Sequence, residues 1–294
     1  MAKDIRIIAR LDIKGPNLVK GIHLEGLRVL GRPEHFARYY YESGADELLY
    51  MDVVASLYNR NSLHEIITKT AHEAFIPLTV GGGLRTLDDI KGVLRAGADK
   101  VALNTAAVKN PGIISEASRK FGSSTIVVAI EAIKQPDGGY LAYTDNGREY
   151  TGIEVVAWAK RIEELGAGEI LLTAVDREGT GLGYDTALIK MVSEAVCLPV
   201  IAHGGAGKLE HIKQAIVDGK ADAVALSSML HYDFIEHHKM GFDSLAEGNT
   251  EFIRSGRSFK IIQAHSLPEI KQFLHQRGID CRVGLDASFK DCAR

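Results

Sequence analysis

The hydrophobic positions of this chain fall into eight short runs, separated by stretches with helical periodicity. The runs are continuous rather than alternating, which is typical of strands buried on both faces in a parallel sheet. The predicted strands are Ile5–Leu11, Glu47–Val53, Pro77–Val80, Lys100–Leu103, Thr125–Ile130, Glu169–Ala174, Pro199–Ala202 and Ala223–Leu226. Amphipathic stretches such as Thr86–Ala96 and Leu209–Asp218 lie between them. Eight β–α units in this length predict a closed (β/α)8 barrel rather than an open sheet.

The second half of the chain repeats the first, segment by segment and in order. The matched pairs are GADELL from Gly44 with GAGEIL from Gly166, PLTVGGG from Pro77 with PVIAHGG from Pro199, ADKVAL from Ala98 with ADAVAL from Ala221, and Leu11-Asp12 with Ile130-Glu131. Four matches in register indicate duplication. We therefore predict two half-barrels, with matched sites on opposite sides of one mouth.

One stretch departs from the repeat. Residues 231–260, after the last predicted strand, contain several glycines and many charges, and helical periodicity resumes at Leu267–Arg277. We expect one barrel over residues 1–294, with an insertion at about 231–260 and a poorly ordered tail from about 284. His231, His237 and His238 fall in this insertion, and we expect a solvated loop there rather than a metal site.

Composition narrows the functional class. The chain has 294 residues, a formal net charge of −3 and three scattered cysteines. This charge does not favour nucleic-acid binding, and the cysteines are too few for a disulfide framework or a zinc site. The N-terminus lacks a signal-peptide core, and no apolar run is long enough for a membrane span. We expect a cytoplasmic protein without a metal or other cofactor.

Two acidic residues occupy matched positions at the ends of the first and fifth predicted strands: Asp12 and Glu131. In an eight-stranded barrel these strands lie opposite each other, and catalytic residues sit at the carboxyl-terminal ends of strands. Two carboxylates across one mouth suit general acid–base catalysis, in which one donates a proton while the other accepts one. The alternative is a pair of capping or salt-bridging carboxylates. Lys20, in the long loop after the first strand, is a candidate phosphate or substrate contact, or a solvated lysine.

Glycines and small polar residues follow four of the strands. They are Gly81–Gly83 and Asn104-Thr105 in the first half, and Gly204-Gly205 and Ser227-Ser228 in the second. Glycines let backbone approach a ligand closely, and free amides at helix N-termini attract anions. One such site is typical of the last two loops of a barrel, and the repeat supplies a second. We predict an elongated substrate with two phosphates; the alternative is that these glycines serve only as turns.

Further acids lie near the same mouth. Glu178 follows the sixth strand and Asp52 ends the second. Gly179, beside Glu178, is able to lend its amide to a phosphate.

These segments resemble the cyclase subunit of imidazole glycerol phosphate synthase, from histidine biosynthesis. The match is carried by LDIKGPNLVKG, ADELLYMDVVAS, VGGGLRTLDDI, ADKVALNTAAV, GAGEILLTAVDREGTGLGYD and GGAGKLEHI; it spans residues 3–230 and resumes in the last helix. In that family a glutaminase subunit sends ammonia through the barrel to a bisphosphorylated ribulosyl intermediate. The ring closes to imidazole glycerol phosphate, and an aminoimidazole carboxamide ribotide leaves.

The resemblance implies roles for individual residues. Asp12 matches the family's general acid–base carboxylate. Gly83, Asn104 and Thr105 match one phosphate site, and the other is matched by Glu178, Gly179, Gly205, Ser227 and Ser228. The ring of charges where ammonia enters is matched by Arg6, Glu47, Lys100 and Glu169. We expect this ring to be paired and to mark the docking face of a glutaminase subunit.

Departures from the family cluster at the mouth. Glu131 and Glu178 replace Asp, Arg10 replaces Cys, His203 replaces Ser, and Gly15-Pro16 replaces an Asp-Gly turn. They raise an alternative, a cyclase-like paralogue that delivers ammonia from a glutaminase to an amidotransferase of surface-sugar synthesis. A third possibility is the related single-chain isomerase of the same pathway, which shares the repeat and the paired carboxylates but not the charged ring.

Overall fold

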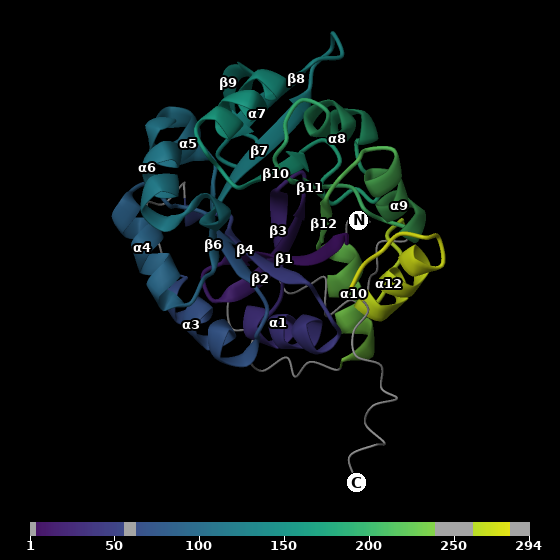
Figure 1. Ribbon diagram of the computed structural model, residues 1–294. Helices are drawn as coiled ribbons and strands as arrows, with labels where there is room; N and C mark the ends of the chain where they lie inside the picture. The colour runs from purple at the N-terminus through teal and green to yellow at the C-terminus, as the bar shows by residue number, and fades with distance from the viewer. Residues whose placement is uncertain (1–3, 56–62, 239–260, 283–294) are drawn as a thin grey trace.

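The computed structural model describes residues 4–55, 63–238 and 261–282. Eight parallel strands close into a barrel, because each strand pairs with its neighbour and β7 also pairs with β10 (Figure 1). In spatial order these strands are β1 (Arg6–Lys14), β4 (Glu47–Asp52), β5 (Leu78–Gly81), β6 (Lys100–Leu103), β7 (Ile126–Lys134), β10 (Glu169–Ala174), β11 (Val200–His203) and β12 (Ala223–Leu226). This arrangement confirms the predicted (β/α)8 barrel.

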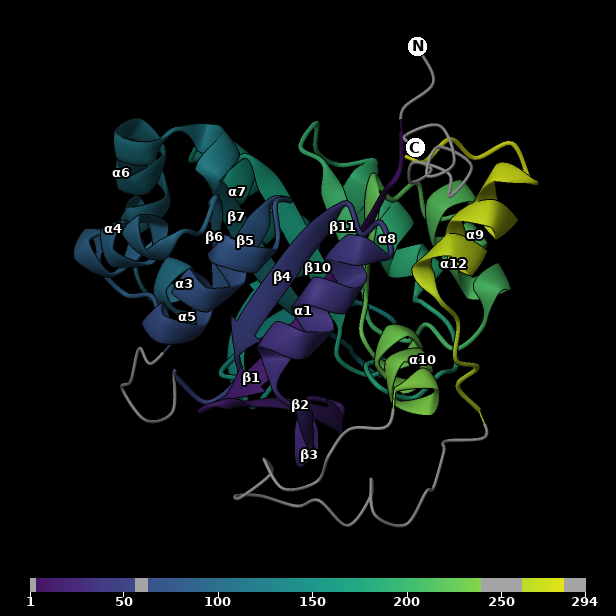
Figure 2. The ribbon, with the colours of Figure 1, turned by 90° about the horizontal axis from the view of Figure 1, so that it is seen from below.

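Helices surround the barrel (Figures 1 and 2). They are α1 (Pro33–Glu42), α3 (His64–Glu73), α4 (Leu87–Ala96), α5 (Thr105–Lys109), α6 (Gly112–Phe121), the short 3₁₀ helix η1 (Ser123–Thr125), α7 (Val155–Glu164), α8 (Thr186–Ser193), α9 (Leu209–Val217), α10 (Ser228–His237) and α12 (Leu267–His275). Helix α4 illustrates how the sequence sets a boundary, since Thr86 and Asp89 form a reciprocal capping box and Gly97 ends the helix in a left-handed conformation.

The first strand of each half continues into an antiparallel hairpin. Strand β1 pairs with β2 (Asn17–Ile22) and β2 with β3 (Glu25–Gly31), and β7 pairs in the same way with β8 (Tyr140–Thr144) and β9 (Glu149–Glu154). Figure 2 shows β2 and β3 projecting from one end of the barrel. This corrects two predictions. The first connection is a hairpin rather than a long loop, and Asp12 and Glu131 lie within longer strands rather than at strand ends.

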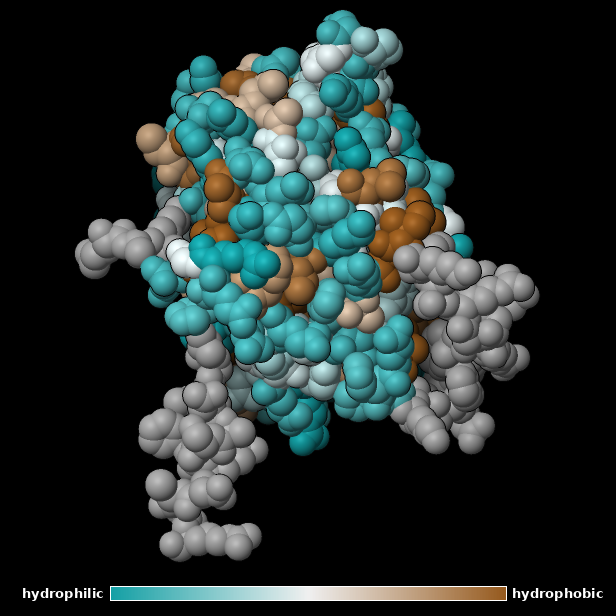
Figure 3. Space-filling model, turned by 90° about the vertical axis from the view of Figure 1, so that its right-hand side faces the viewer, coloured by the Kyte–Doolittle hydropathy of each residue, from teal (hydrophilic) through white to brown (hydrophobic). Residues whose placement is uncertain are grey.

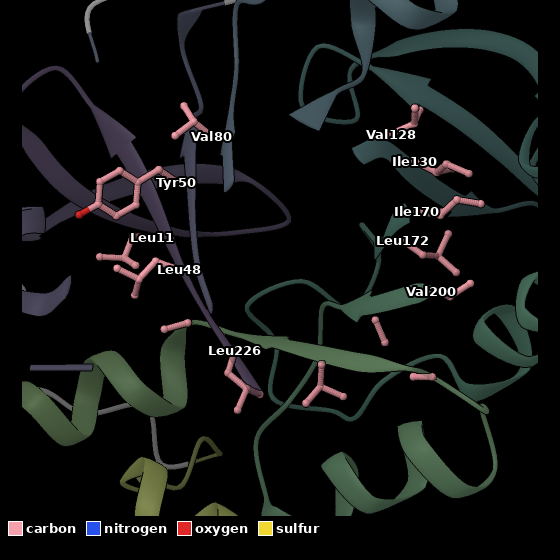
Figure 4. Packing of buried hydrophobic residues seen from close by; sticks show 14 of the residues in the cluster. Leu11, Leu48, Tyr50, Val80, Val128, Ile130, Ile170, Leu172, Val200 and Leu226 are labelled. Atoms are coloured by element: carbon pink, nitrogen blue, oxygen red, sulfur yellow. The ribbon is translucent and has the colours of Figure 1, made fainter. Parts of the chain in front are cut away.

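Side chains of the barrel strands alternate between two apolar clusters. On β1, Ile7, Ala9 and Leu11 face the helices, whereas Ile8 faces the lumen. The lumen cluster consists of Ile8, Leu49, Ala102, Val127, Ala129, Leu171, Ile201, Ala223 and Ala225. Figure 4 shows part of the outer cluster, to which residues such as Leu48, Tyr50 and Ile130 belong. Because the side-chain period of a strand is two, Arg6, Arg10 and Asp12 point into the lumen with Ile8.

The expected insertion begins later than residue 231, because residues 231–237 belong to α10. His231 is fully buried, and its Nδ1 lies 2.6 Å from the hydroxyl of Tyr40. Burial lowers its pKa to about 3, so the ring is neutral. The expectation of a solvated loop is therefore wrong at His231. In the repeat, the pair α10 and α12 corresponds to the pair α5 and α6. The remainder of the expected insertion therefore falls between α10 and α12. Its residues 239–260, and the expected tail from about 284, lie outside the described residues.

The surface on the side displayed in Figure 3 is mostly hydrophilic, with hydrophobic residues in small separate areas. Among residues 4–55, 63–238 and 261–282, no helix is long and apolar enough to cross a membrane.

Candidate active site

Asp12 and Glu131 face each other across the barrel. Strands β1 and β7 are separated by β4, β5 and β6 on one side and by β12, β11 and β10 on the other. Glu131 follows Val127 and Ala129 at the lumen-facing period of β7, so both carboxylates point inward near the carboxyl ends of the strands. The structure therefore brings the two predicted acid–base residues to one mouth.

Asp12 is held by an arginine on its own strand. The Nε of Arg10 donates to Oδ1 of Asp12 over 2.9 Å. Both side chains are buried; Arg10 is only 4% exposed. A buried guanidinium is costly without a counter-charge, and this carboxylate supplies it. The sequence marked Arg10 as a departure, but it gave no sign of this contact.

A histidine and a threonine contact Arg10 from the far side. His203 on β11 and Thr173 on β10 each point into the lumen, two residues after Ile201 and Leu171. The NH1 of Arg10 lies 3.1 Å from Nδ1 of His203 and 3.5 Å from Oγ1 of Thr173. Burial, followed by the charges of Arg10 and Lys20, holds the pKa of His203 well below its usual value. A guanidinium only donates, so Nδ1 is the acceptor and the neutral ring carries its proton on Nε2.

Glu131 lies in a different electrostatic setting. Burial raises the pKa of its carboxyl to about 7, although the amide of Gly147, the charge of Arg10 and a hydrogen bond with Asn104 oppose the rise. The Gly147 amide donates to Oε2 over 2.8 Å. Gly147 follows Asp145 and Asn146 in the β8–β9 turn, and all three have positive φ angles. Asp-Asn-Gly is a recognisable hairpin turn, so this contact had a sequence signal that was missed.

A cavity of about 290 Å³ joins Glu131 to the first predicted phosphate site. Its lining residues are Met51, Asp52, Gly82, Gly83, Leu84, Arg85, Ala102, Asn104, Thr105, Ala106, Lys109, Asn110, Glu131, Asp145 and Asn146. Two cations, Arg85 and Lys109, lie in this wall. The Asp52 side chain binds the backbone that follows it, because its Oδ1 accepts hydrogen bonds from the amides of Val54 and Ala55.

The two predicted phosphate sites share one backbone design. Asn104 precedes α5 with φ −128° and ψ −87°, and Ser227 precedes α10 with φ −124° and ψ −81°. The first amides of each helix have no intrahelical acceptor. The glycine pairs also correspond, because Gly82, Gly83, Gly204 and Gly205 all have positive φ angles. The duplication therefore extends to the conformations that would receive an anion.

The two sites differ in exposure. Gly83, Asn104 and Thr105 are partly exposed, whereas Gly205, Ser227 and Ser228 are buried. A Cβ at Gly205 would lie 2.2 Å from the carbonyl oxygen of Gly183, so only glycine fits there. Within the described residues, Oγ of Ser227 is buried without a hydrogen-bond partner. An unpaired buried hydroxyl is costly, and a ligand oxygen would satisfy it.

Lys20 and Glu178 form a buried ion pair. Lys20 lies on β2 and is 5% exposed, so it is not a solvated lysine. The second oxygen of Glu178 accepts from the amide of Leu24 over 2.9 Å, and a Cβ at Gly179 would meet the carbonyl of Gly21. These residues fasten the β2–β3 hairpin to the connection after β10. Their predicted contact with phosphate stays a prediction.

At the opposite end of the barrel, four charges form a closed ring. Arg6 contacts Glu47 at 3.0 Å and Glu169 at 3.1 Å, and Lys100 contacts the same two carboxylates, each at 3.1 Å. Each residue begins its strand: β1, β4, β6 and β10. Thr79 also donates to Glu47. The expected pairing of the ring is confirmed. In the described ranges, no group of three His, Cys, Asp or Glu side chains is arranged to hold a metal.

Comparison with known proteins agrees with this geometry. Residues 6–236 match the family model described as histidine biosynthesis protein. A relative from Legionella pneumophila is 60% identical over 207 residues, which cover 70% of this chain and 98% of the relative. One from Methanocaldococcus jannaschii is 49% identical over 77% of this chain and 90% of its own length, and one from Alkaliphilus metalliredigens is 41% identical over 94% and 98%.

All three relatives carry the name imidazole glycerol phosphate synthase subunit HisF. Identities of 41–60% over most of each chain establish a common family. The family model, over residues 6–236, includes every barrel strand. This chain belongs to the histidine biosynthesis family and, within it, to the HisF subunits of imidazole glycerol phosphate synthase.

Proposed function

We propose that this chain is the cyclase subunit of an imidazole glycerol phosphate synthase, a lyase that uses ammonia to close an imidazole ring. One observation carries the proposal: Asp12 and Glu131 point into one mouth from opposite strands and differ in environment. Asp12 is paired with the cation of Arg10. Burial raises the pKa of the Glu131 carboxyl to about 7, so this group is protonated below that pH and loses its proton above it.

This pairing suits incorporation of ammonia at a carbonyl followed by ring closure. Such steps need a proton delivered to a leaving oxygen and another removed from nitrogen. A carboxyl whose pKa lies near the working pH is an effective general acid, and a carboxylate is the matching base. We assign the acid role to Glu131 and the base role to Asp12.

The substrate we propose is a bisphosphorylated ribulosyl-aminoimidazole intermediate. One phosphate would lie against Gly83, Asn104 and Thr105, near the cations of the cavity wall. The other would lie against Gly179, Gly205, Ser227 and Ser228, with Glu178 and Lys20 fixing the hairpin beside it. The reacting centre would then lie between Asp12 and Glu131.

The partner we propose is a glutaminase subunit, docked at the end of the barrel that holds Arg6, Glu47, Lys100 and Glu169. A charged ring at the amino ends of barrel strands is unusual, since that face generally serves stability. Ammonia released there would reach the mouth along the lumen.

The ammonia-delivery paralogue is not favoured, because three relatives of 41–60% identity are all named as synthase subunits. The single-chain isomerase is not favoured either, since the four-charge ring is complete.

The second phosphate site yields a binding prediction. Ser227→Ala removes a hydroxyl that has no protein partner in the described residues, so the stability of the free protein should not fall. A hydrogen bond to a charged group contributes about 1.5–3 kcal/mol. We therefore expect KM to rise about 10- to 100-fold with kcat nearly unchanged, as for loss of uniform binding. Steady-state kinetics with ammonium chloride measure this. An unchanged KM would remove Ser227 from the phosphate site.

The pKa of Glu131 yields a pH prediction. If Glu131 is the general acid, its protonated form is lost as pH rises through about 7, and kcat should fall about tenfold per unit above that value. Because ammonia itself becomes more abundant with pH, rates must be compared at a fixed concentration of free ammonia. Glu131→Gln has no titrating group at this position, so its residual activity should not show the fall in kcat above pH 7. A wild-type profile that stays flat from pH 6.5 to 9 would exclude Glu131 as the acid.

A further inference from the structure

Among the described residues, Arg10 is the one buried arginine, and it lies next to the apolar lumen layer on the side of the mouth. On β1 it follows Ile8 and precedes Asp12 at the lumen-facing period. Its contacts reach three strands: Asp12 on β1, Thr173 on β10 and His203 on β11. A planar fork held from two sides has little freedom to turn.

The contacts of Arg10 are directional. Nε donates to Asp12, and NH1 donates to the histidine behind it. His203 and Thr173 also contact each other, with Nδ1 and Oγ1 3.2 Å apart. A protonated His203 would face the guanidinium as a like charge, so the neutral ring is the form that fits this geometry. The arrangement therefore braces the guanidinium against the Asp12 carboxylate.

We propose that Arg10 is a positioning residue of the cyclase site, which fixes the Asp12 carboxylate and, through its charge, keeps the two facing carboxylates in separate roles. The proposal rests on the proposed function and adds a residue to it. Arg10 contacts neither phosphate site, so it acts through Asp12 and through the electric field at Glu131.

The field of Arg10 acts on Glu131 in a stated direction. Its cation lowers the pKa of that carboxyl against the upward effect of burial. The charges of Arg10 and Asp145 act on Glu131, and Asp52, Arg85 and Lys109 lie in the wall of the same cavity. Asp12 lies across the lumen on β1. Removing Arg10 takes away a positive charge that lowers the pKa of Glu131. The pKa of Glu131 should therefore rise.

The test is a double-mutant cycle between Arg10→Met and Asp12→Ala, assayed with ammonium chloride. We expect Arg10→Met alone to lower kcat about 10- to 100-fold with little change in KM, because a misplaced catalytic group costs rate rather than ground-state binding. In the Asp12→Ala background it should have less than a threefold further effect. Equal factors in both backgrounds, or a change confined to KM, would overturn the positioning role.

A second readout needs no turnover. In carbon-13 NMR of labelled glutamate side chains, Glu131 should titrate near pH 7 in the wild type and at higher pH in Arg10→Met. Arg10→Lys retains a charge without the planar fork, so it should keep the Glu131 titration near the wild-type value while kcat stays low. An unshifted Glu131 in Arg10→Met would overturn the electrostatic part of the proposal. If wild type itself fails to turn over, the proposed function fails, and the NMR titration still decides on Arg10.

Lys271→Met is the matched control. Lys271 is also a buried cation, paired with Asp46 at 2.7 Å, but it lies on α12 away from the mouth. Its loss should lower stability without moving the Glu131 titration. If Lys271→Met shifted Glu131 as far as Arg10→Met does, general destabilisation would explain both results and the proposal would be wrong. If Arg10→Met fails to fold, Arg10→Gln, which is also neutral, replaces it both in the cycle and in the NMR titration.

Discussion

Replacing Asp12 or Glu131 by Ala is expected to lower ammonium-dependent cyclisation by about 10²–10⁴-fold, the usual contribution of a positioned acid or base. The two residues lie on opposite strands of the barrel, and each points into the lumen. KM should change little, because neither carboxylate is placed to bind phosphate. Single-turnover kinetics separate the chemical step from product release.

Glu131→Asp is the matched control for geometry. It keeps the charge but draws the carboxylate back by about 1.5 Å, one carbon–carbon bond. The Gly147 amide, 2.8 Å from Oε2 in the wild type, would lose its acceptor. Because a 1 Å misplacement can cost about 10²-fold in rate, we expect lower turnover than wild type. Higher turnover would mean that Glu131 is poorly fitted to its surroundings and that the Gly147 contact does not set the reactive position of the carboxyl.

Replacing Glu47 by the neutral Gln is expected to lower the stability of the barrel and to impair the transfer of ammonia from the charged ring to the mouth. Glu47 is buried and contacts Arg6, Lys100 and Thr79. Removing one partner from a buried ion pair costs about 3–5 kcal/mol; we expect about 3 kcal/mol for Glu47→Gln, because both cations retain Glu169 and are partly exposed. Chemical denaturation measures this loss. With a glutaminase partner present, glutamine-driven turnover should fall far more than turnover driven by saturating ammonium chloride.

Glu65→Gln is the control for the ring experiment. Glu65 is also paired with a lysine, Lys69 at 2.7 Å, but both side chains are exposed on α3. Exposed pairs contribute little, so stability and both activities should match wild type. An equal fall in the two activities of Glu47→Gln would contradict a role in ammonia transfer and leave the ring with a structural one.

Much of the barrel could be predicted because buried parallel strands leave continuous apolar runs. Strands β6, β10 and β12 have the bounds that the sequence predicted. The sequence duplication alone predicts that Asp12 lies opposite Glu131, since matched positions in two half-barrels must face each other. The ring was predictable only through the family resemblance, because four charges at strand starts have no local signature.

The remaining features depend on contacts between distant residues. Lys20 and Glu178 are 158 positions apart, and their pairing depends on how the β2–β3 hairpin folds back over the barrel. That hairpin turns at His23 and Leu24, which adopt positive φ without the Asn or Gly that usually signals it. His203 and Arg10 are likewise joined only by barrel closure. Helix α10 was obscured because its polar residues, including His231 and Asp233, are buried rather than solvated.

The central claim, that this chain closes an imidazole ring with ammonia, is tested most directly by one assay. The purified chain is mixed with the bisphosphorylated ribulosyl intermediate and ammonium chloride at pH 7, without a glutaminase, and release of the aminoimidazole carboxamide ribotide is followed. We predict turnover at least a hundredfold above that of the Asp12→Ala, Glu131→Ala double variant. Wild-type turnover equal to that of the double variant, from a protein that still binds the substrate, would contradict it.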